Sequence, residues 1–115
     1  RAAIAALESS ASWLPGNLGV FRERRDAAVR AFADAGFRTS TPRATMYLWI
    51  PLPEGVASST FADALMEEGV IVLPGSGLGV GGEGFFRVSF ITSPPRIADA
   101  ARRAGQVLQG MVAKV

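Results

Sequence analysis

Residues 85–91 have the sequence FFRVSFI, and they follow a loop, residues 75–84, that contains six glycines. Aromatic and β-branched residues dominate this stretch, which is typical of a half-buried β-strand. Arg87 is the exception, because a guanidinium within a strand costs free energy unless it reaches water or an anion. Its planar fork of N–H donors matches a carboxylate or a phosphate at two points. We therefore expect a strand that carries a carboxylate-binding arginine at the mouth of a cleft.

Arg87 could instead have a structural role. Arginines are common on exposed sheet faces, where they often pair with a nearby acid, and Glu83 is such an acid. Tyr47 and Trp49 fall on one face of an earlier strand and could line a pocket, although such aromatic pairs more often belong to a core. The residues alone leave these alternatives open.

The composition is that of one ordered globular domain. The chain has 115 residues, of which 49% are hydrophobic and 19% are charged, so it is large enough to bury a core. The formal net charge is only +2, and arginines alternate with acids, as in residues 22–26. Because no basic stripe is interleaved with aromatic residues, nucleic-acid binding is not expected. Membrane insertion is not expected either, because no apolar run approaches the about 20 residues that span a bilayer.

Several residue types that carry catalysis are missing. The chain has no histidine and no cysteine, and its only lysine is Lys114. This removes the commonest proton shuttle, the thiolate nucleophile, an internal Schiff-base lysine and the usual zinc ligands. Ser76 and Ser89 have no histidine to activate them. We therefore expect part of an active site rather than a whole one, with no metal, and the absence of cysteine favours a reducing, cytoplasmic compartment.

Hydrophobic periodicity predicts the secondary structure. The expected elements, in chain order, are the end of a helix at 1–10, a linker at 9–19, a helix at 18–35, a strand at 44–50, a helix capped by Ser58 or Ser59 and ended by Gly69, strands at 70–73 and 85–91, and a helix that starts at Ser93. The strand at 44–50 is apolar on both faces, so both faces are expected to be covered. This order predicts an α+β fold, in which a small, mainly antiparallel sheet of about three strands has helices packed on one face.

The glycine loop has a formal match to a nucleotide-binding motif. Residues 77–82, GLGVGG, fit the pattern G-x-G-x-x-G. Dinucleotide binding requires a helix directly after the glycines, because phosphate binds the N-terminal amides of that helix, and here a strand follows. No lysine follows either, which excludes a P-loop. The loop is therefore expected to be a flexible connection between strands, or a cover over a ligand held by Arg87.

Three stretches resemble the C-terminal small domain of the class I/II aminotransferases, which are pyridoxal-phosphate enzymes of fold type I. They are FRERRD at 21–26, PRATMYLW at 42–49, and GVIVLPGSGLGVGGEGFFRVS at 69–89. The third stretch is the most specific, since it contains the family's Gly-apolar-Pro-Gly segment and then its Gly-Glu-Gly-aromatic-apolar-Arg-apolar-Ser segment. Together the stretches span nearly the whole chain, and the glycine loop is most similar to that of diaminopimelate aminotransferases.

The resemblance implies that residues 1–115 are the small domain, with the end of a helix and a linker at 1–19, and that a large cofactor-binding domain completes the enzyme. It implies that Arg87 binds the α-carboxylate of an amino-acid substrate. The implied enzyme is a homodimer that transfers an amino group between an amino acid and a 2-oxo acid. Its pyridoxal 5'-phosphate is held mainly by the large domain, so this chain alone is expected to be inactive.

Other residues are candidates for lining the implied site. Tyr47, Gly77 and Leu78 are candidate pocket-lining residues. Leu78 stands where the family often has an aromatic residue, and Thr45 stands where a glycine or an alanine is common. Two other functions stay open: a stand-alone module that binds a carboxylate or another small molecule, and the small domain of a different fold type I enzyme, such as a lyase or an acyl-transfer synthase.

Overall fold

The computed structural model describes residues 2–112. Its elements, in chain order, are α1 (Ala2–Asp34), β1 (Tyr47–Pro51), α2 (Ser58–Glu67), β2 (Leu73–Pro74), the short 3-10 helices η1 (Gly75–Leu78) and η2 (Val80–Gly82), β3 (Phe85–Ser89) and α3 (Pro94–Val112). Within these residues, no helix combines the length and the hydropathy that crossing a membrane requires. Lys114, the only lysine of the chain, lies outside the described residues.

The three strands form one antiparallel sheet in the order β1-β3-β2. The central strand is the one that carries the arginine. In the register, Arg87 of β3 lies opposite Trp49 of β1 on one side and Leu73 of β2 on the other. The expected small antiparallel sheet is therefore confirmed, and Arg87 lies at its middle.

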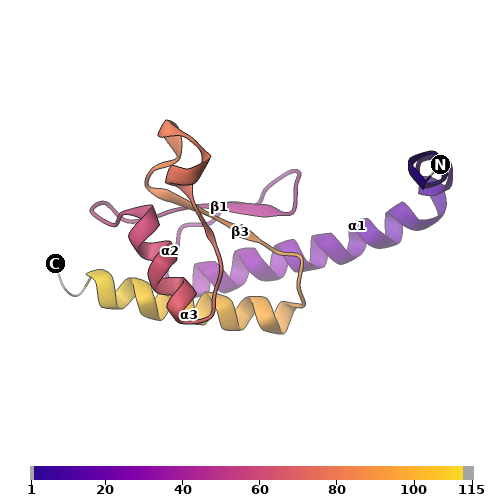
Figure 1. Cartoon of the computed structure of the whole chain (residues 1–115). Coiled ribbons are helices and arrows are strands. Elements are labelled where there is room, and N and C mark those ends of the chain that lie inside the picture. The colour runs from indigo at the N-terminus through magenta and orange to yellow at the C-terminus, as the bar shows by residue number, and fades with distance from the viewer. Residues whose placement is uncertain (1, 113–115) are drawn as a thin grey trace.

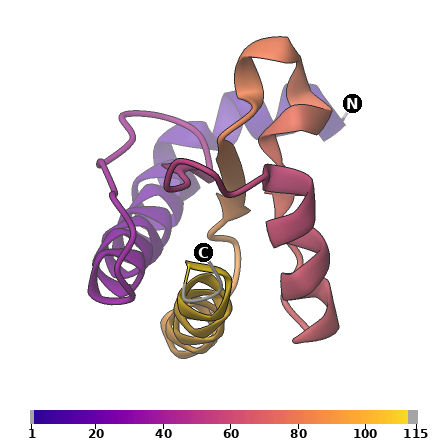
Figure 2. The ribbon, with the colours of Figure 1, turned by 90° about the vertical axis from the view of Figure 1, so that its left-hand side faces the viewer.

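The helices cover one face of this sheet, as the sequence predicts. Figures 1 and 2 show α1 and α3 beneath the strands, with α2 beside them on the same side. Alternate residues of β3 point to this side, because side chains alternate along a strand. Phe86 and Val88, with Phe90 just beyond the strand, are at most 7% exposed. The ring of Phe86 lies 5.0–6.2 Å, between centroids, from those of Phe32, Phe37 and Phe61.

The last helix packs through the apolar stripe that its periodicity predicts. Its buried residues are Ile97, Ala101, Ala104, Gly105 and Leu108. Gly105 lets α3 approach the end of α1, since a Cβ at this position would lie 2.8 Å from the carbonyl oxygen of Ala35. The start of the helix is also confirmed. The carbonyl oxygen of Ser93 accepts hydrogen bonds from the backbone amides of Arg96 and Ile97.

The linker expected at residues 9–19 is wrong, because α1 continues through it to Asp34. Proline removes one hydrogen bond from a helix interior and its ring disturbs the preceding turn, so Pro15 favours a break. A single missing bond can bend a helix without ending it. Figure 1 shows the N-terminal end of α1 turned away from the axis of the rest. In this segment the hydroxyl of Ser9 donates to the carbonyl oxygen of Ala5, four residues earlier, at 2.6 Å. A serine that favours a linker in the sequence therefore bonds to the backbone of the helix.

All three strands have bounds that differ from the expectation, and β3 ends at Ser89 rather than at residue 91. β1 begins at Tyr47 rather than at residue 44, because Thr45 has a φ of 74°, a left-handed conformation that interrupts an extended strand. Its second face is not covered by any described residues, and Trp49 is 41% exposed there. Of the strand expected at 70–73, only Leu73 pairs with β3, and Pro74 pairs with it as well. The preceding residues diverge from β3, and a groove opens between them.

The expected serine cap of α2 is also wrong. The N-cap residue is Ala57, and neither Ser58 nor Ser59 makes a capping hydrogen bond within the helix. Ser58 is instead fully buried and bonds to Glu83, a residue 25 positions later. The end of the helix agrees with the expectation, since Gly69 follows it with a φ of 81° that favours glycine.

Candidate functional site

The candidate site lies on the open face of the sheet, opposite the helices. Arg87 is half-buried on this face, because it alternates with the buried residues Phe86 and Val88 of the same strand. Its guanidinium carbon lies 4.0 Å from the centroid of the Tyr47 ring, in a cation–π contact. The structure therefore brings together Arg87 and Tyr47, two of the residues that the sequence nominates, and the Tyr47 ring orients the guanidinium.

Arg87 has no acidic partner in the part of the chain that the structure describes. The ion pairs found there join Arg25 to Asp26, and Asp99 to Arg102 and Arg103. Glu83, which the sequence offers as the structural partner of Arg87, bonds to Ser58 instead. A guanidinium that stacks on an aromatic ring keeps the N–H donors at its edges available. Arg87 can therefore offer its fork to an external carboxylate.

Aromatic side chains surround the arginine on the open face. Trp49 stacks on Phe85 with 5.1 Å between ring centroids and 11° between ring planes. Leu73 lies on the other side of Arg87 and is 37% exposed. A flat apolar surface of this kind lowers the local dielectric constant around a bound anion, which strengthens its interaction with the guanidinium once water is excluded. The face is thus suited to hold a small organic acid.

The glycine loop contains two short 3-10 helices. Residues 75–82 form η1 and η2, and η1 packs against β3. Figure 1 shows the loop rising from the sheet on the side away from α1 and α3. Gly77 and Leu78, both candidate pocket residues, are exposed on η1, and within residues 2–112 no hydrogen bond or ring contact joins them to Arg87. Tyr47 contacts Arg87 directly, whereas these two residues do not bond to it.

Sequence reasoning missed a network of hydrogen bonds behind the loop. The carboxylate of Glu83 accepts from the Ser58 hydroxyl at 2.7 Å and from the Ser58 amide at 3.1 Å. The Ser58 hydroxyl in turn accepts from the amide of Ser76 at 3.3 Å. The bonds from Ser58, hydroxyl first, lower the pKa of Glu83 below its ordinary value, and the amide of Gly84 adds to them, whereas desolvation raises it. The sequence signal that could have pointed to this network is an acidic residue, Glu83, between the two glycines Gly82 and Gly84.

Two glycines allow the ends of this loop to touch. A Cβ on Gly75 would lie 1.8 Å from the carbonyl oxygen of Gly82, and a Cβ on Gly82 would lie 2.0 Å from the carbonyl oxygen of Gly75. Real Cβ atoms do not approach backbone oxygens so closely, because the overlap is strongly repulsive. The contact between the two ends of the loop therefore requires glycine at both positions.

Replacing Gly75 with alanine is expected to destabilise the chain by about 1–3 kcal/mol, because the new methyl group forces the two backbone segments apart. Gly77→Ala is the matched control, since a Cβ there meets nothing within 4 Å. That variant should stay within about 0.5 kcal/mol of the natural chain. Urea unfolding followed by circular dichroism measures both. Equal effects of the two substitutions would show that the contact with Gly82 does not limit the loop.

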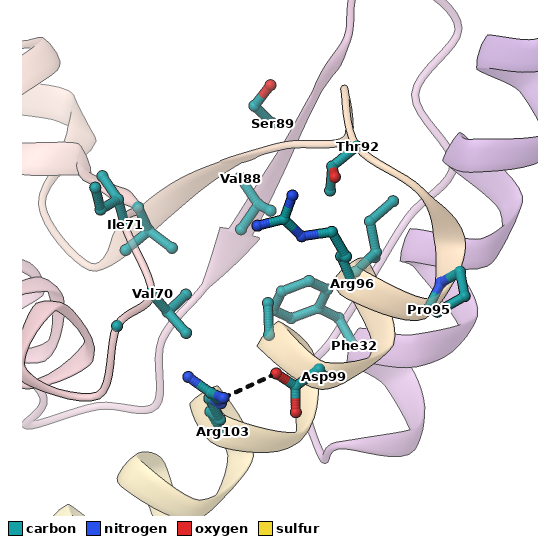
Figure 3. Close-up of a pocket in the computed structure, with 14 residues that line it drawn as sticks. Phe32, Val70, Ile71, Val88, Ser89, Thr92, Pro95, Arg96, Asp99 and Arg103 are labelled. Atoms are coloured by element: carbon teal, nitrogen blue, oxygen red, sulfur yellow. Dashed lines mark ion pairs between the residues drawn. The ribbon is translucent and has the colours of Figure 1, made fainter.

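A groove of about 580 Å³ lies on the other side of the sheet, next to the start of α3. Figure 3 shows Arg96 and Arg103 extending from α3, with Phe32 between them in this view, and Val88 also lines the groove. Arg103 donates to the carbonyl oxygen of Glu68 and pairs with Asp99 at 3.1 Å. A hydrogen bond from Arg102 is the main cause that lowers the pKa of Asp99. None of the residues that the sequence nominates for a site lines this groove.

Two further features bear on the chemistry. Among residues 2–112, Thr45 is the one residue other than glycine that has a positive φ. Glycine adopts this conformation without strain, which explains why it suits this position. Its hydroxyl oxygen accepts from the amide of Tyr47 at 3.4 Å, so the strained residue lies beside the start of β1. Among the described residues, no group of three acidic side chains converges to hold a metal ion.

Comparisons with known proteins agree on one family. The family model "Aminotransferase class I and II" matches residues 1–103. The chain is 41% identical over 115 residues to the LL-diaminopimelate aminotransferase of Desulforudis audaxviator, with 99% of this chain and 28% of that protein covered. It is also 41% identical over 108 residues to the LL-diaminopimelate aminotransferase of Moorella thermoacetica, with 93% of this chain and 28% of that protein covered. The chain thus spans little more than a quarter of the length of these curated relatives.

Solved structures show the same likeness in three dimensions. A probable N-succinyldiaminopimelate aminotransferase from Thermus thermophilus matches with a TM-score of 0.72 and 40% identity, over 76% of this chain and 24% of that one. An aromatic aminotransferase from Pyrococcus horikoshii matches with a TM-score of 0.82 and 26% identity, over 91% of this chain and 29% of that one. In both cases the match covers most of this chain and a minor part of the other.

Proposed function

The chain belongs to the class I and II aminotransferase family, and we propose that it is the small domain of a pyridoxal-phosphate aminotransferase, in which Arg87 binds the carboxylate of the substrate. The enzyme would transfer an amino group between an amino acid and a 2-oxo acid. One observation carries the role of Arg87. It is held on an open sheet face by Tyr47, and no acid of the described residues neutralises it.

The contribution of Arg87 to the reaction is positional. Two parallel N–H···O bonds to a carboxylate fix both the place and the rotation of the bound acid. The stacked Tyr47 ring limits the rotamers of the arginine, so less entropy is lost when the acid binds. A substrate held in this way presents its Cα–H bond in one orientation, and such alignment can supply a large share of a rate enhancement.

The cofactor does not fit this chain alone. Pyridoxal phosphate attaches to aminotransferases through a lysine, and residues 2–112 contain none. When bound, the cofactor supplies the electron sink of the reaction. Its lysine and its phosphate-binding groups would therefore come from the large domain, which fits the short span of this chain relative to its relatives.

The open face suggests where that large domain would lie. Trp49 and Leu73 are exposed around Arg87, and a protein surface that covered them would exclude water from the bound acid. The small domain would then act as a lid that closes on the substrate. The resemblance also implies a homodimer. The names of the relatives favour LL-diaminopimelate as the amino donor.

The two alternative functions have less support. A stand-alone carboxylate-binding module would not be expected to align along nearly its full length with one part of much longer enzymes. A lyase or an acyl-transfer synthase of the same fold is disfavoured because the relatives and neighbours compared are named aminotransferases.

Titration of the 115-residue chain with glutarate tests the role of Arg87 without the cofactor. Glutarate has two carboxylates and no amino group, and one bidentate pair is expected to give a Kd on the order of 10 mM. In NMR spectra the Nε–H resonance of Arg87 and the backbone amide resonances of β3 around it should move upon saturation, and Arg87→Gln should abolish the change in those amide resonances. Arg102→Gln, on the helical side, should leave it intact. Shifts confined to the groove of Arg96 and Arg103 would contradict the proposal.

A further inference from the structure

We propose that Glu83 is a positioning residue, which latches the glycine loop to the start of α2 and so fixes the segment that leads into the strand of Arg87. The role of Arg87 in this inference rests on the proposed function, whereas the latch itself rests on hydrogen bonds within the chain. Three separate segments meet at the latch: the first residue of α2, the second residue of η1 and the end of the loop. Figure 2 shows the start of α2 directly below the loop.

The latch has one buried component and one exposed component. Ser58 is 0% exposed, and both its hydroxyl and its amide are used by Glu83. No buried polar side-chain atom of the described residues is left without a partner, so removing the carboxylate would leave the Ser58 hydroxyl to find a new acceptor inside the protein. Glu83 itself lies at the surface. A substitution at Glu83 therefore places no new side chain in the core, but it removes the acceptor of the buried Ser58 hydroxyl.

Other contacts also hold the loop, since η1 packs against α2, β2 and β3, and the amide of Leu52 donates to the carbonyl oxygen of Gly84 at 2.7 Å. The Gly75–Gly82 contact closes its base, and the amide of Gly82 donates to the carbonyl oxygen of Gly79 at 3.1 Å. Val80 is fully exposed and Leu78 is 47% exposed, so these two side chains add little burial within the described residues. The base contact brings the two ends of the loop together but does not tie them to α2. Glu83 and the amide of Ser76 supply that tie through Ser58, and Glu83 does so two residues before the strand that carries Arg87.

The latch depends on the negative charge of Glu83 as well as on the positions of its partners. No charged side chain contributes to the shift of the pKa of Glu83, which comes from Ser58, Gly84 and desolvation. Because folding lowers the pKa of Glu83, the ionised carboxylate stabilises the folded chain at pH values above the ordinary pKa of a glutamate. This contribution is lost as the pH falls through the lowered value. The latch is therefore expected to be closed at neutral pH and to open in acid.

Amide hydrogen exchange of the 115-residue chain tests the latch directly. In Glu83→Gln one neutral amide oxygen replaces two carboxylate oxygens that share a single negative charge, so the amides of Ser58 and Ser76 should exchange about tenfold faster, and Glu83→Ala should have a larger effect. Amides of the β1–β3 ladder should change by less than about twofold. Glu54→Gln is the matched control, because Glu54 is exposed and has no bonding partner among the described residues.

A pH titration separates positioning from a general effect on stability. In the natural chain, the amide resonances of Ser58 and Ser76 should follow one titration below the ordinary pKa of a glutamate, and Glu83→Gln should remove it. Unchanged exchange in the loop of both variants would overturn the inference. So would equal acceleration in the loop and in the β1–β3 ladder, since that indicates global destabilisation. Neither readout uses a carboxylate ligand, so a latched chain that binds no glutarate contradicts the proposed function alone.

Discussion

Replacing Phe86 with alanine is expected to remove about 3–5 kcal/mol of the free energy of unfolding of the 115-residue chain. Phe86 is 0% exposed, and its ring contacts three others, which come from α1, from the segment after it and from α2. Truncation leaves a cavity at the point where the sheet meets the helices. A domain of this size has about 5–15 kcal/mol of stability in total, so the variant should be close to unfolding at room temperature.

Phe85→Ala is the matched control for this prediction. Phe85 is the preceding residue of the same strand, but it lies on the open face, half-buried and stacked on Trp49. Losing that stacked pair should cost about 0.5–1.5 kcal/mol. Thermal and urea unfolding measure both variants. If Phe85→Ala were as destabilising as Phe86→Ala, the assignment of buried and open faces to β3 would be wrong.

Patterns that repeat along the chain allowed much of this fold to be predicted. The alternation of residues 85–91 fixes which side chains of β3 are buried, and the stripe of α3 recurs along the length of the helix. Such signals are redundant, so one unusual residue does not change them. The same reasoning predicted the helices on one face, because a sheet with one apolar face must bury it.

Single residues and long-range contacts explain what could not be predicted. Pro15 signals a break, yet α1 continues past it, because the rest of the hydrogen-bond ladder remains. Thr45 delays the start of β1 through a backbone conformation that its residue type disfavours. Ser58 has the residue type and place of a helix cap, but its partner is 25 residues away. Local propensity contains no information about such a partner.

The candidate site likewise has one part that the sequence predicts and another that only the folded chain shows. Arg87 could be identified from its own strand, because a charged residue in an apolar strand demands an explanation. Whether it pairs with Glu83 could not be decided from the sequence. That depends on the competing bonds between Glu83 and Ser58, which only the folded chain brings together. The contact between Arg87 and Tyr47 likewise depends on the register of β1 and β3.

Arg87→Lys is expected to lower kcat/KM about ten- to a hundredfold in the full-length enzyme that contains this domain, although the positive charge is kept. Lysine offers a point charge in place of a planar two-donor fork, so one charge-assisted bond to the carboxylate and the orientation of the substrate are lost. Such a bond is worth about 1.5–3 kcal/mol. Lysine also loses the flat contact with the Tyr47 ring. Folding should change by less than about 0.5 kcal/mol, since Arg87 is outside the core.

The central claim is that Arg87 holds the carboxylate of the substrate, and the most direct measurement is kcat/KM for the amino donor in Arg87→Lys, recorded with a melting curve. Arg102→Lys, an exposed arginine of α3 that pairs with Asp99, is the control and should behave as the natural enzyme. The account predicts a loss of at least about tenfold in kcat/KM with an unchanged melting temperature. Near-normal kcat/KM would contradict it, and a variant that fails to fold would show that Arg87 serves the structure of the sheet instead.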